Sequence, residues 1–82
     1  MGKHFSSLPR YTWEEVKTHN NSKSCWIVAH GYVYDATAFL NKHPVGSKPI
    51  LDKAGKDATI DFDFHGPKSQ KEWNKYRIGI VT

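Results

Sequence analysis

Residues 25–37 read CWIVAHGYVYDAT, and this stretch decides the fold. It is rich in β-branched and aromatic residues, and Gly31 stands in its middle. Two apolar runs separated by a glycine are typical of two strands joined by a tight turn. The stretch therefore predicts a β-hairpin that turns at His30 and Gly31.

A helix is predicted on the N-terminal side of the hairpin. The segment TWEEVKTHN, residues 12–20, has Thr12 in the N-cap position and Glu15 three residues later. This spacing is the capping-box pattern, in which two side chains satisfy free N–H groups of the first turn. We expect the helix to end near Asn20-Asn21, with a short strand beginning at Tyr11.

The C-terminal side of the hairpin is predicted to form several short helices. Asp35 or Thr37 is expected to cap the first, over 37–42. Frequent glycine and proline residues limit the others to one to three turns, and we expect them over 48–54, 58–64 and 68–76. IGIV, residues 78–81, is expected to form a closing strand. Strands near both ends with four or five short helices indicate an α+β fold.

Length and composition set the limits of function. Eighty-two residues make one domain, which we assign to 10–82, with 1–9 as a flexible arm. Cys25 is the only cysteine, which excludes an internal disulfide, and no apolar run is long enough for a membrane span. The net charge is +4, but the lysines are scattered, so we expect a mixed-charge surface and no nucleic-acid partner. The opening MGKHFS matches the N-myristoylation pattern at Gly2, a short pattern that often occurs by chance.

Two later segments share a layout. FLNKHPVG (39–46) and FDFHGP (62–67) each contain an aromatic helical segment, then a histidine, then a helix breaker. Proline disfavours helix at the residue before it, so His43 must leave its helix, and Gly66 ends the segment after His65 in the same way. We therefore expect a pocket with one histidine on each wall.

Zinc and haem are the two groups to weigh for such a pocket. A zinc site needs three or four ligands, and no C-x-x-C or H-x-x-x-H spacing supplies them. A haem needs only two axial ligands and an apolar slot. The side chains available for that slot are Phe39, Val45, Ile50, Leu51, Phe62, Phe64 and Trp73. The spacing alone leaves open haem or two ordinary, partly buried histidines.

Residues 10–81 resemble the cytochrome b5 family. The matching stretches are YTWEEVKTHN, SKSCWIVAHGYVYDATAFLNKHP, AGKDAT and YRIG. The family motif His-Pro-Gly-Gly, whose histidine is an axial haem ligand, stands here as His43-Pro44-Val45-Gly46. The second axial histidine of the family corresponds to His65, which follows Phe62.

The resemblance implies a small cytochrome b5-like fold, with a short mixed sheet and a crevice for haem b. It implies His43 and His65 as the metal ligands. The expected cofactor-binding residues are these two histidines with Phe39, Pro44, Val45, Ile50, Phe62, Ser69 and Trp73. Ser69 resembles a position near a haem propionate, although a solvated serine is the equal alternative. Val45 replaces a glycine, so we expect ordinary backbone there and retained haem binding.

The resemblance implies electron transfer rather than enzymatic catalysis. Two histidines on the iron leave no open position for oxygen, so the domain would shuttle single electrons, alone or within a larger oxidoreductase. We also expect a ring nitrogen of each histidine to donate to a helix carbonyl. One alternative is a non-redox haem or small-ligand module of the progesterone-receptor-like branch, which lacks this histidine pair. Another is a basic interaction domain without a cofactor.

The expected partners are a cytochrome b5 reductase and an acceptor oxidoreductase, met by a monomer. The expected location is the cytoplasm, or the cytosolic face of a membrane if a tail anchor lies beyond Thr82. Lysines and aspartates alternate near the pocket, where the family often presents an acidic surface. We therefore predict weaker attraction to strongly basic partners. The remaining histidines, His4, His19 and His30, are expected to lie on the surface.

Overall fold

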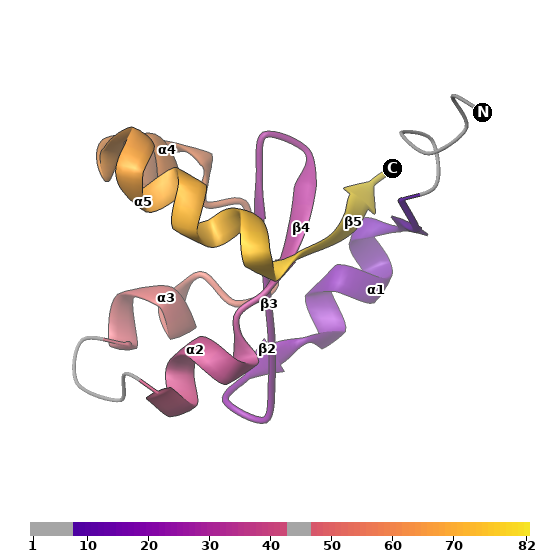
Figure 1. The fold of residues 1–82 in the computed structure, drawn as a ribbon. Helices are drawn as coiled ribbons and strands as arrows, with labels where there is room; N and C mark the ends of the chain where they lie inside the picture. The colour runs from indigo at the N-terminus through magenta and orange to yellow at the C-terminus, as the bar shows by residue number, and fades with distance from the viewer. Residues whose placement is uncertain (1–7, 43–46) are drawn as a thin grey trace.

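The computed structural model describes residues 8–42 and 47–82 (Figure 1). His43, Pro44, Val45 and Gly46 therefore lie outside the described residues, as do 1–7. The described part has the predicted α+β architecture, a sheet combined with short helices. None of its helices is both long and apolar enough to cross a membrane.

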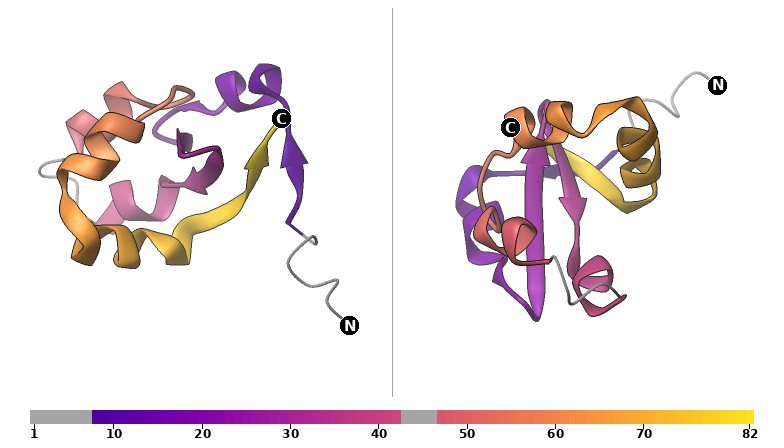
Figure 2. Two further views of the ribbon diagram at one scale, coloured as in Figure 1. Left: turned by 90° about the horizontal axis from the view of Figure 1, so that it is seen from above. Right: turned by 90° about the vertical axis from the view of Figure 1, so that its left-hand side faces the viewer.

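The sheet has the strand order β1-β5-β4-β3-β2. Its strands are β1 (Arg10–Tyr11), β2 (Asn20–Asn21), β3 (Ser24–Ala29), β4 (Tyr32–Asp35) and β5 (Arg77–Val81). β1 pairs with β5 in parallel, and the other neighbours are antiparallel, so the sheet is mixed as expected. The first and last strands thus lie side by side (Figure 2).

The predicted hairpin is confirmed. β3 and β4 pair with Val28 opposite Val33, and the two residues of the turn, His30 and Gly31, have φ values of 52° and 78°. Positive φ at both central residues is the requirement of a type I′ turn, whose twist matches that of the strands. Glycine meets this requirement without strain, and histidine is among the few other residues that adopt positive φ with some frequency.

Strand β3 separates two hydrophobic clusters because its side chains alternate between the faces of the sheet. One cluster contains Cys25, Ile27 and Ala29 of β3 and packs against the helices that follow the hairpin. The other contains Trp26 and Val28 and packs against the N-terminal helix. The first cluster forms the base on which a site between the later helices is built.

Helix α1 (Trp13–Thr18) begins as predicted, since Thr12 Oγ1 accepts a hydrogen bond from Glu15 N at 3.1 Å. Its predicted end near Asn20 is wrong. The helix stops at Thr18 because the next residues form β2 against β3. Pairing with a buried strand therefore prevails over local helical preference.

The later helices are α2 (Thr37–Lys42), α3 (Lys48–Asp52), α4 (Thr59–Phe64) and α5 (Gly66–Trp73), followed by a 3₁₀ turn at Asn74–Tyr76. Asp35 Oδ1 accepts from Thr37 N at 3.0 Å and so supplies the predicted cap of α2. The last helix was predicted to begin at 68, but it begins at Gly66 and includes Pro67. Proline is tolerated there because N–H groups in the first turn have no helical partner.

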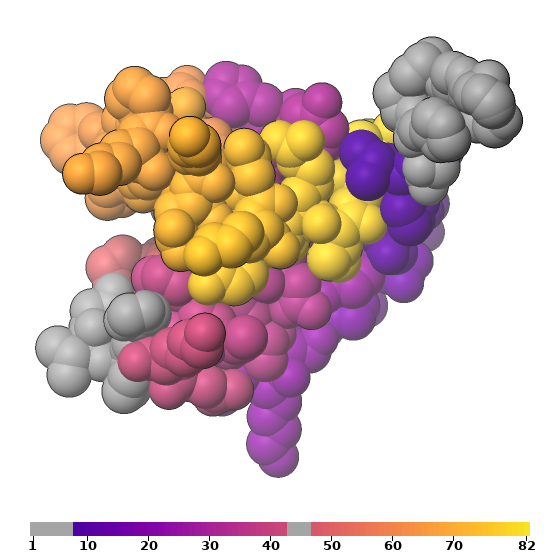
Figure 3. Space-filling view, viewed as in Figure 1, coloured from indigo at the N-terminus to yellow at the C-terminus, as the bar shows by residue number. Residues whose placement is uncertain are grey.

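These helices lie on one side of the sheet in two pairs, away from α1 (Figure 1). α4 and α5 form one pair, and α2 and α3 form the other. In the space-filling view the surface is hollowed between the two pairs (Figure 3).

Candidate functional site

A crevice of about 580 Å³ opens between the two pairs of helices. Cofactor pockets commonly have volumes of this order and are mainly apolar with a few polar groups. The lining residues are Ile27, Phe39, Pro49, Ile50, Asp52, Lys53, Ala58, Asp61, Phe62, His65, Ser69 and Trp73. The crevice therefore brings together six of the predicted site residues, Phe39, Ile50, Phe62, His65, Ser69 and Trp73.

Aromatic side chains form much of the crevice wall. The ring centroids of Phe39 and Trp73 are 5.1 Å apart, which links α2 to α5 across the crevice. Phe62 of α4 packs on buried Tyr34 of the sheet, with centroids 5.5 Å apart. Flat apolar walls of this kind suit a flat aromatic ligand.

His65 supplies a metal-ligating group on one wall of the crevice. It caps the C-terminus of α4, where its N–H donates to Phe62 O at 3.3 Å. Gly66 then adopts a φ of 83°, which allows the chain to turn at once into α5. The predicted break after His65 is therefore confirmed, although Gly66 also begins the next helix.

The His65 ring is exposed and has no hydrogen-bond partner among the described residues. The expected bond from this ring to a helix carbonyl is thus absent from the described part of the chain. Its contact is instead with the Phe64 ring, at a centroid separation of 6.1 Å. The imidazole nitrogens remain available for a metal.

Phe64 does not line the crevice, contrary to the sequence analysis. Its side chain is 86% exposed. Ala58, Phe62 and His65 follow the three- and four-residue spacing that places side chains on one helical face, and Phe64 lies off that face. Leu51 packs against the hydrophobic cluster below the crevice rather than lining it.

Two acidic groups that line the crevice are paired with lysines of the same chain. Lys53 Nζ lies 3.5 Å from Asp61 Oδ2, and Lys48 Nζ lies 3.3 Å from Asp52 Oδ1. On the other side of α4, His30 Nε2 lies 2.6 Å from Asp63 Oδ1. The carboxylates near the crevice therefore do not form an isolated acidic patch.

Asp57 has a structural role at the start of α4. Its Oδ1 accepts from Thr59 N at 2.7 Å. Hydrogen bonds from the Thr59 side chain and backbone lower the pKa of Asp57 below its usual value. The charge thus stabilises the first turn of the helix that carries His65.

Sequence reasoning missed several contributors to the site. Ile27, Pro49 and Ala58 line the crevice, and the ring of His30 contacts α4. His30 was predicted to be a surface residue, and it is exposed, but it is not free of contacts. The hairpin pattern around it carried no signal for a partner 33 residues away.

Comparison with known proteins identifies the family. Residues 12–82 match the family model described as "Cytochrome b5-like Heme/Steroid binding domain". The chain is 53% identical over 74 residues to nitrate reductase [NADH] of Cucurbita maxima, and 50% identical over 74 residues to nitrate reductase [NADH] 2 of Arabidopsis thaliana. Each match covers 88% of this chain but only 8% of the relative, so the chain spans a small part of these relatives.

Solved structures agree with the sequence comparison. Cytochrome b5 of Ostreococcus tauri virus 2 is 39% identical, with a TM-score of 0.76, over 87% of this chain and 94% of that chain. Cytochrome b558 of Ectothiorhodospira vacuolata, a prokaryotic homologue of cytochrome b5, is 29% identical, with a TM-score of 0.80, over 90% and 99% of the two chains.

The residues of the crevice fit a haem. The porphyrin itself supplies four nitrogen ligands, so the protein needs an apolar slot and axial donors. The aromatic walls provide the slot, and His65 offers an imidazole that has no hydrogen bond to any described residue. A cytochrome b5 domain is an electron carrier, which agrees with the expectation that the domain alone is not an enzyme. The chain therefore belongs to the cytochrome b5 family, and its cofactor is haem b.

Proposed function

We propose that this domain is a bis-histidine b-type cytochrome, with His43 and His65 as the two axial ligands of one haem iron. The observation that carries the proposal is the available imidazole of His65 on the wall of an apolar crevice. His43 lies outside the described residues, but the described residues on either side of it, Phe39 and Pro49, line the same crevice. Both candidate ligands thus belong to segments associated with one site.

The proposed role is to shuttle single electrons between a reductase, such as a cytochrome b5 reductase, and an acceptor oxidoreductase. When bound, haem supplies a one-electron Fe(III)/Fe(II) couple. Two protein ligands would leave no coordination position for oxygen. The contribution of the chain is to hold the imidazoles and to limit water around them, since solvent exposure and hydrogen bonding tune the potential.

The nitrate reductase relatives support a role within or beside a larger oxidoreductase. The similarity is confined to 8% of their length, which fits a domain that relays electrons to chemistry performed elsewhere. We place this relay in the cytoplasm and expect the domain to be a monomer.

The spectrum of the haem-reconstituted protein tests the ligand assignment. The wild type should show a sharp low-spin Soret band and, after reduction, split α and β bands. His43→Ala and His65→Ala should each yield five-coordinate iron or lose haem, because each removes one axial donor. His19→Ala is the matched control, since His19 bonds to Ser24 away from the crevice and should keep the low-spin spectrum.

Three results would contradict the proposal. A high-spin wild-type spectrum would favour the non-redox ligand-binding branch. Failure to take up haem would favour a cofactor-free interaction domain. A low-spin spectrum retained by either ligand variant would mean that the wrong histidine has been assigned.

A further inference from the structure

His30 combines an unfavourable backbone conformation with contacts to a distant helix. Its φ of 52° lies in the left-handed region, which is uncommon for residues other than glycine, although asparagine, aspartate and histidine adopt it more often than the rest. A residue held in such a conformation is a reason to look for a functional constraint. The turn itself needs no imidazole, so the contacts of this histidine are the place to look for its role.

The backbone and the ring of His30 both reach α4. His30 N donates to Thr59 Oγ1 at 3.0 Å, and the ring nitrogen Nε2 lies 2.6 Å from Asp63 Oδ1. Thr59 and Asp63 are four residues apart and therefore lie on the same face of the helix. His30 of the hairpin turn is therefore bonded to α4 at both the first and the last turn of the helix.

Thr59 and Asp63 are not among the residues that line the crevice, but they belong to α4, the helix that forms one wall of it. The edge of the His30 ring also contacts Phe62, with centroids 6.0 Å apart and planes at 77°. Phe62 lines the crevice, and His65 follows α4 directly as its C-cap. A rotation of α4 would therefore move both a wall residue and the candidate ligand.

The two ends of α4 are held differently. The start is fixed to the sheet by backbone bonds, including Ala58 N to Val28 O at 2.6 Å. The later part is held by side chains: Asp63 by His30, Asp61 by Lys53, and Phe62 by Tyr34. Since the His65 ring has no hydrogen bond among the described residues, its direction depends on where this later part of α4 lies.

We infer that His30 is a positioning residue for the haem ligand: by holding Thr59 and Asp63, it fixes the rotation of α4 and the direction in which His65 presents its imidazole. This inference rests on the proposed function, because it requires His65 to bind the iron. His30 itself does not line the crevice; it contacts the crevice wall only from behind, through Phe62.

The test compares haem-loaded wild type with His30→Asn, Asp63→Ala and the double variant. Asparagine tolerates the left-handed backbone and keeps the bond from the backbone N–H, but its side chain is too short to reach Asp63. We expect each single variant to lose haem to apomyoglobin about two- to fivefold faster than the wild type. This range corresponds to the small stabilisation that a half-exposed pair such as His30 and Asp63 provides. The double variant should be no faster than the single ones, because both remove the same contact.

The spectroscopic measurement distinguishes positioning from loss of stability. The three variants should remain low-spin but show EPR g values and a midpoint potential displaced from those of the wild type. His19→Ala is the matched control, since it removes a side-chain bond of the same length, 2.6 Å, between His19 Nδ1 and Ser24 Oγ on the other face of the sheet. It should lower stability without moving the g values or the potential.

Three outcomes would overturn the inference. A His30→Asn protein with the g values, potential and haem-loss rate of the wild type would do so while leaving the bis-histidine proposal intact. Equal displacements in His30→Asn and His19→Ala would do so as well, since they would show a general loss of stability. A wild type without low-spin haem would remove the proposed function and this inference together.

Discussion

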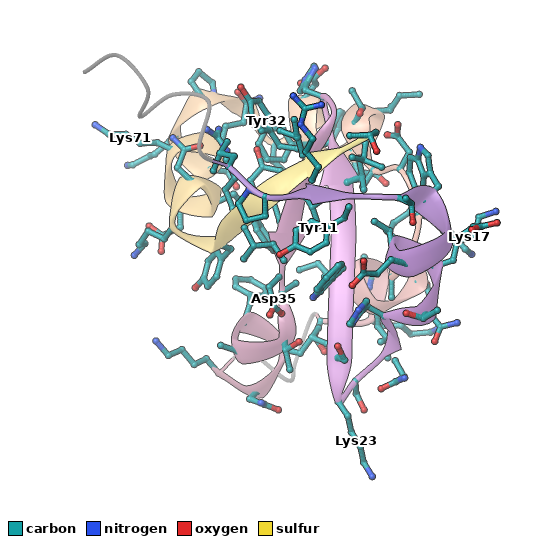
Figure 4. All side chains as sticks on the ribbon, turned by 90° about the vertical axis from the view of Figure 1, so that its right-hand side faces the viewer. Tyr11, Lys17, Lys23, Tyr32, Asp35 and Lys71 are labelled. Carbon is teal, nitrogen blue, oxygen red and sulfur yellow. The ribbon has the colours of Figure 1, made fainter. Side chains whose placement is uncertain are left out.

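Gly79 shows how a single residue sets the spacing between β1 and β5. A Cβ atom placed on it would lie 2.5 Å from Pro9 O and 2.6 Å from Cε2 of Tyr11. Tyr11 belongs to β1 and lies over the middle of the sheet (Figure 4). Its ring packs edge-on against Trp26, with centroids 4.7 Å apart. Glycine is therefore required at this position because of close approach rather than a special backbone angle.

Gly79→Ala should destabilise the fold, because the added methyl must displace β1 or β5. Overpacking of this kind costs about 1–3 kcal/mol in free energy of unfolding, measurable by urea denaturation. In a control chain that begins at Arg10, the Pro9 carbonyl is gone and the same substitution should cost less. A full-length variant within about 0.5 kcal/mol of the wild type would contradict this account.

Cys25 illustrates the effect of burial on chemistry. It is fully buried in the cluster below the crevice. Burial, with a smaller effect from the charge of Asp35, raises the pKa of its thiol to about 11. The thiol therefore stays protonated at neutral pH and acts as a small apolar side chain.

Helix α4 depends on its contacts with the rest of the chain. It has six residues, too few for a stable helix in isolation. Val28 of β3 bonds to Lys56 O and Ala58 N just before the helix, and Asp57 caps its first turn. The backbone bonds to β3 therefore fix where α4, and with it this wall of the crevice, begins.

Asp57→Ala should weaken α4 by removing this cap, at a cost of about 0.5–2 kcal/mol at pH 7. The pKa of Asp57 is lowered in the folded state, so its contribution is present above the ordinary value of 3.8 and disappears as the pH falls through the folded-state pKa. Urea unfolding of the apoprotein at pH 7 and at pH 2–3 should show the difference between wild type and variant shrinking with acid.

Asp52→Ala is the control for that experiment. Asp52 forms an exposed ion pair with Lys48, and such pairs contribute only about 0.3–0.5 kcal/mol. A stability difference for Asp57→Ala that is no larger than that of the control, or that stays constant into acid, would rule out the cap.

Local patterns predicted some elements well. The hairpin follows from alternating apolar residues around Gly31, and the caps at Thr12 and Asp35 follow from single side chains next to helix starts. The end of α1 did not follow, because Asn20 and its neighbour pair with a strand outside the local window. Propensity loses to tertiary pairing wherever the partner is a buried strand.

In the candidate site too, local patterns predicted some residues, whereas contacts between distant segments were missed. Break patterns and family resemblance led to His65, Phe62 and Trp73, all of which line the crevice. They did not predict the contacts of His30 with α4. These contacts join His30 to Thr59, 29 residues later, and to Asp63, 33 residues later. Contacts of this kind depend on where the hairpin turn lies in space, and no short sequence pattern encodes that.

At the scale of the whole molecule, positive charge is dispersed. The net charge is +4, and Lys17, Lys23 and Lys71 extend outward from different parts of the surface (Figure 4). Within the described residues, Lys56, Lys68 and Lys71 have no ion pair, whereas Asp52 and Asp61 each pair with a lysine and Asp63 bonds to the ring of His30. The surface around the crevice therefore offers little free negative charge for a basic partner.

This distribution predicts a weak dependence of partner reduction on salt. With haem bound, the rate of reduction by a cytochrome b5 reductase should change by less than roughly twofold between low salt and about 0.5 M, where surface charges are screened beyond a few ångströms. Attraction between opposite charges would instead produce a steep loss of rate.

A charge-reversed variant provides the contrast, because it creates the acidic surface that the wild type lacks. Lys56→Glu combined with Lys68→Glu lowers the net charge by four, so a basic reductase should reduce it faster at low salt and lose that gain as salt rises. The fold should be unaffected, since both lysines are exposed and without ion pairs in the described part of the chain. If the rate of the wild type falls with salt as steeply as that of the variant, this prediction is wrong. The attraction to the partner would then come from charges elsewhere than on the surface around the crevice.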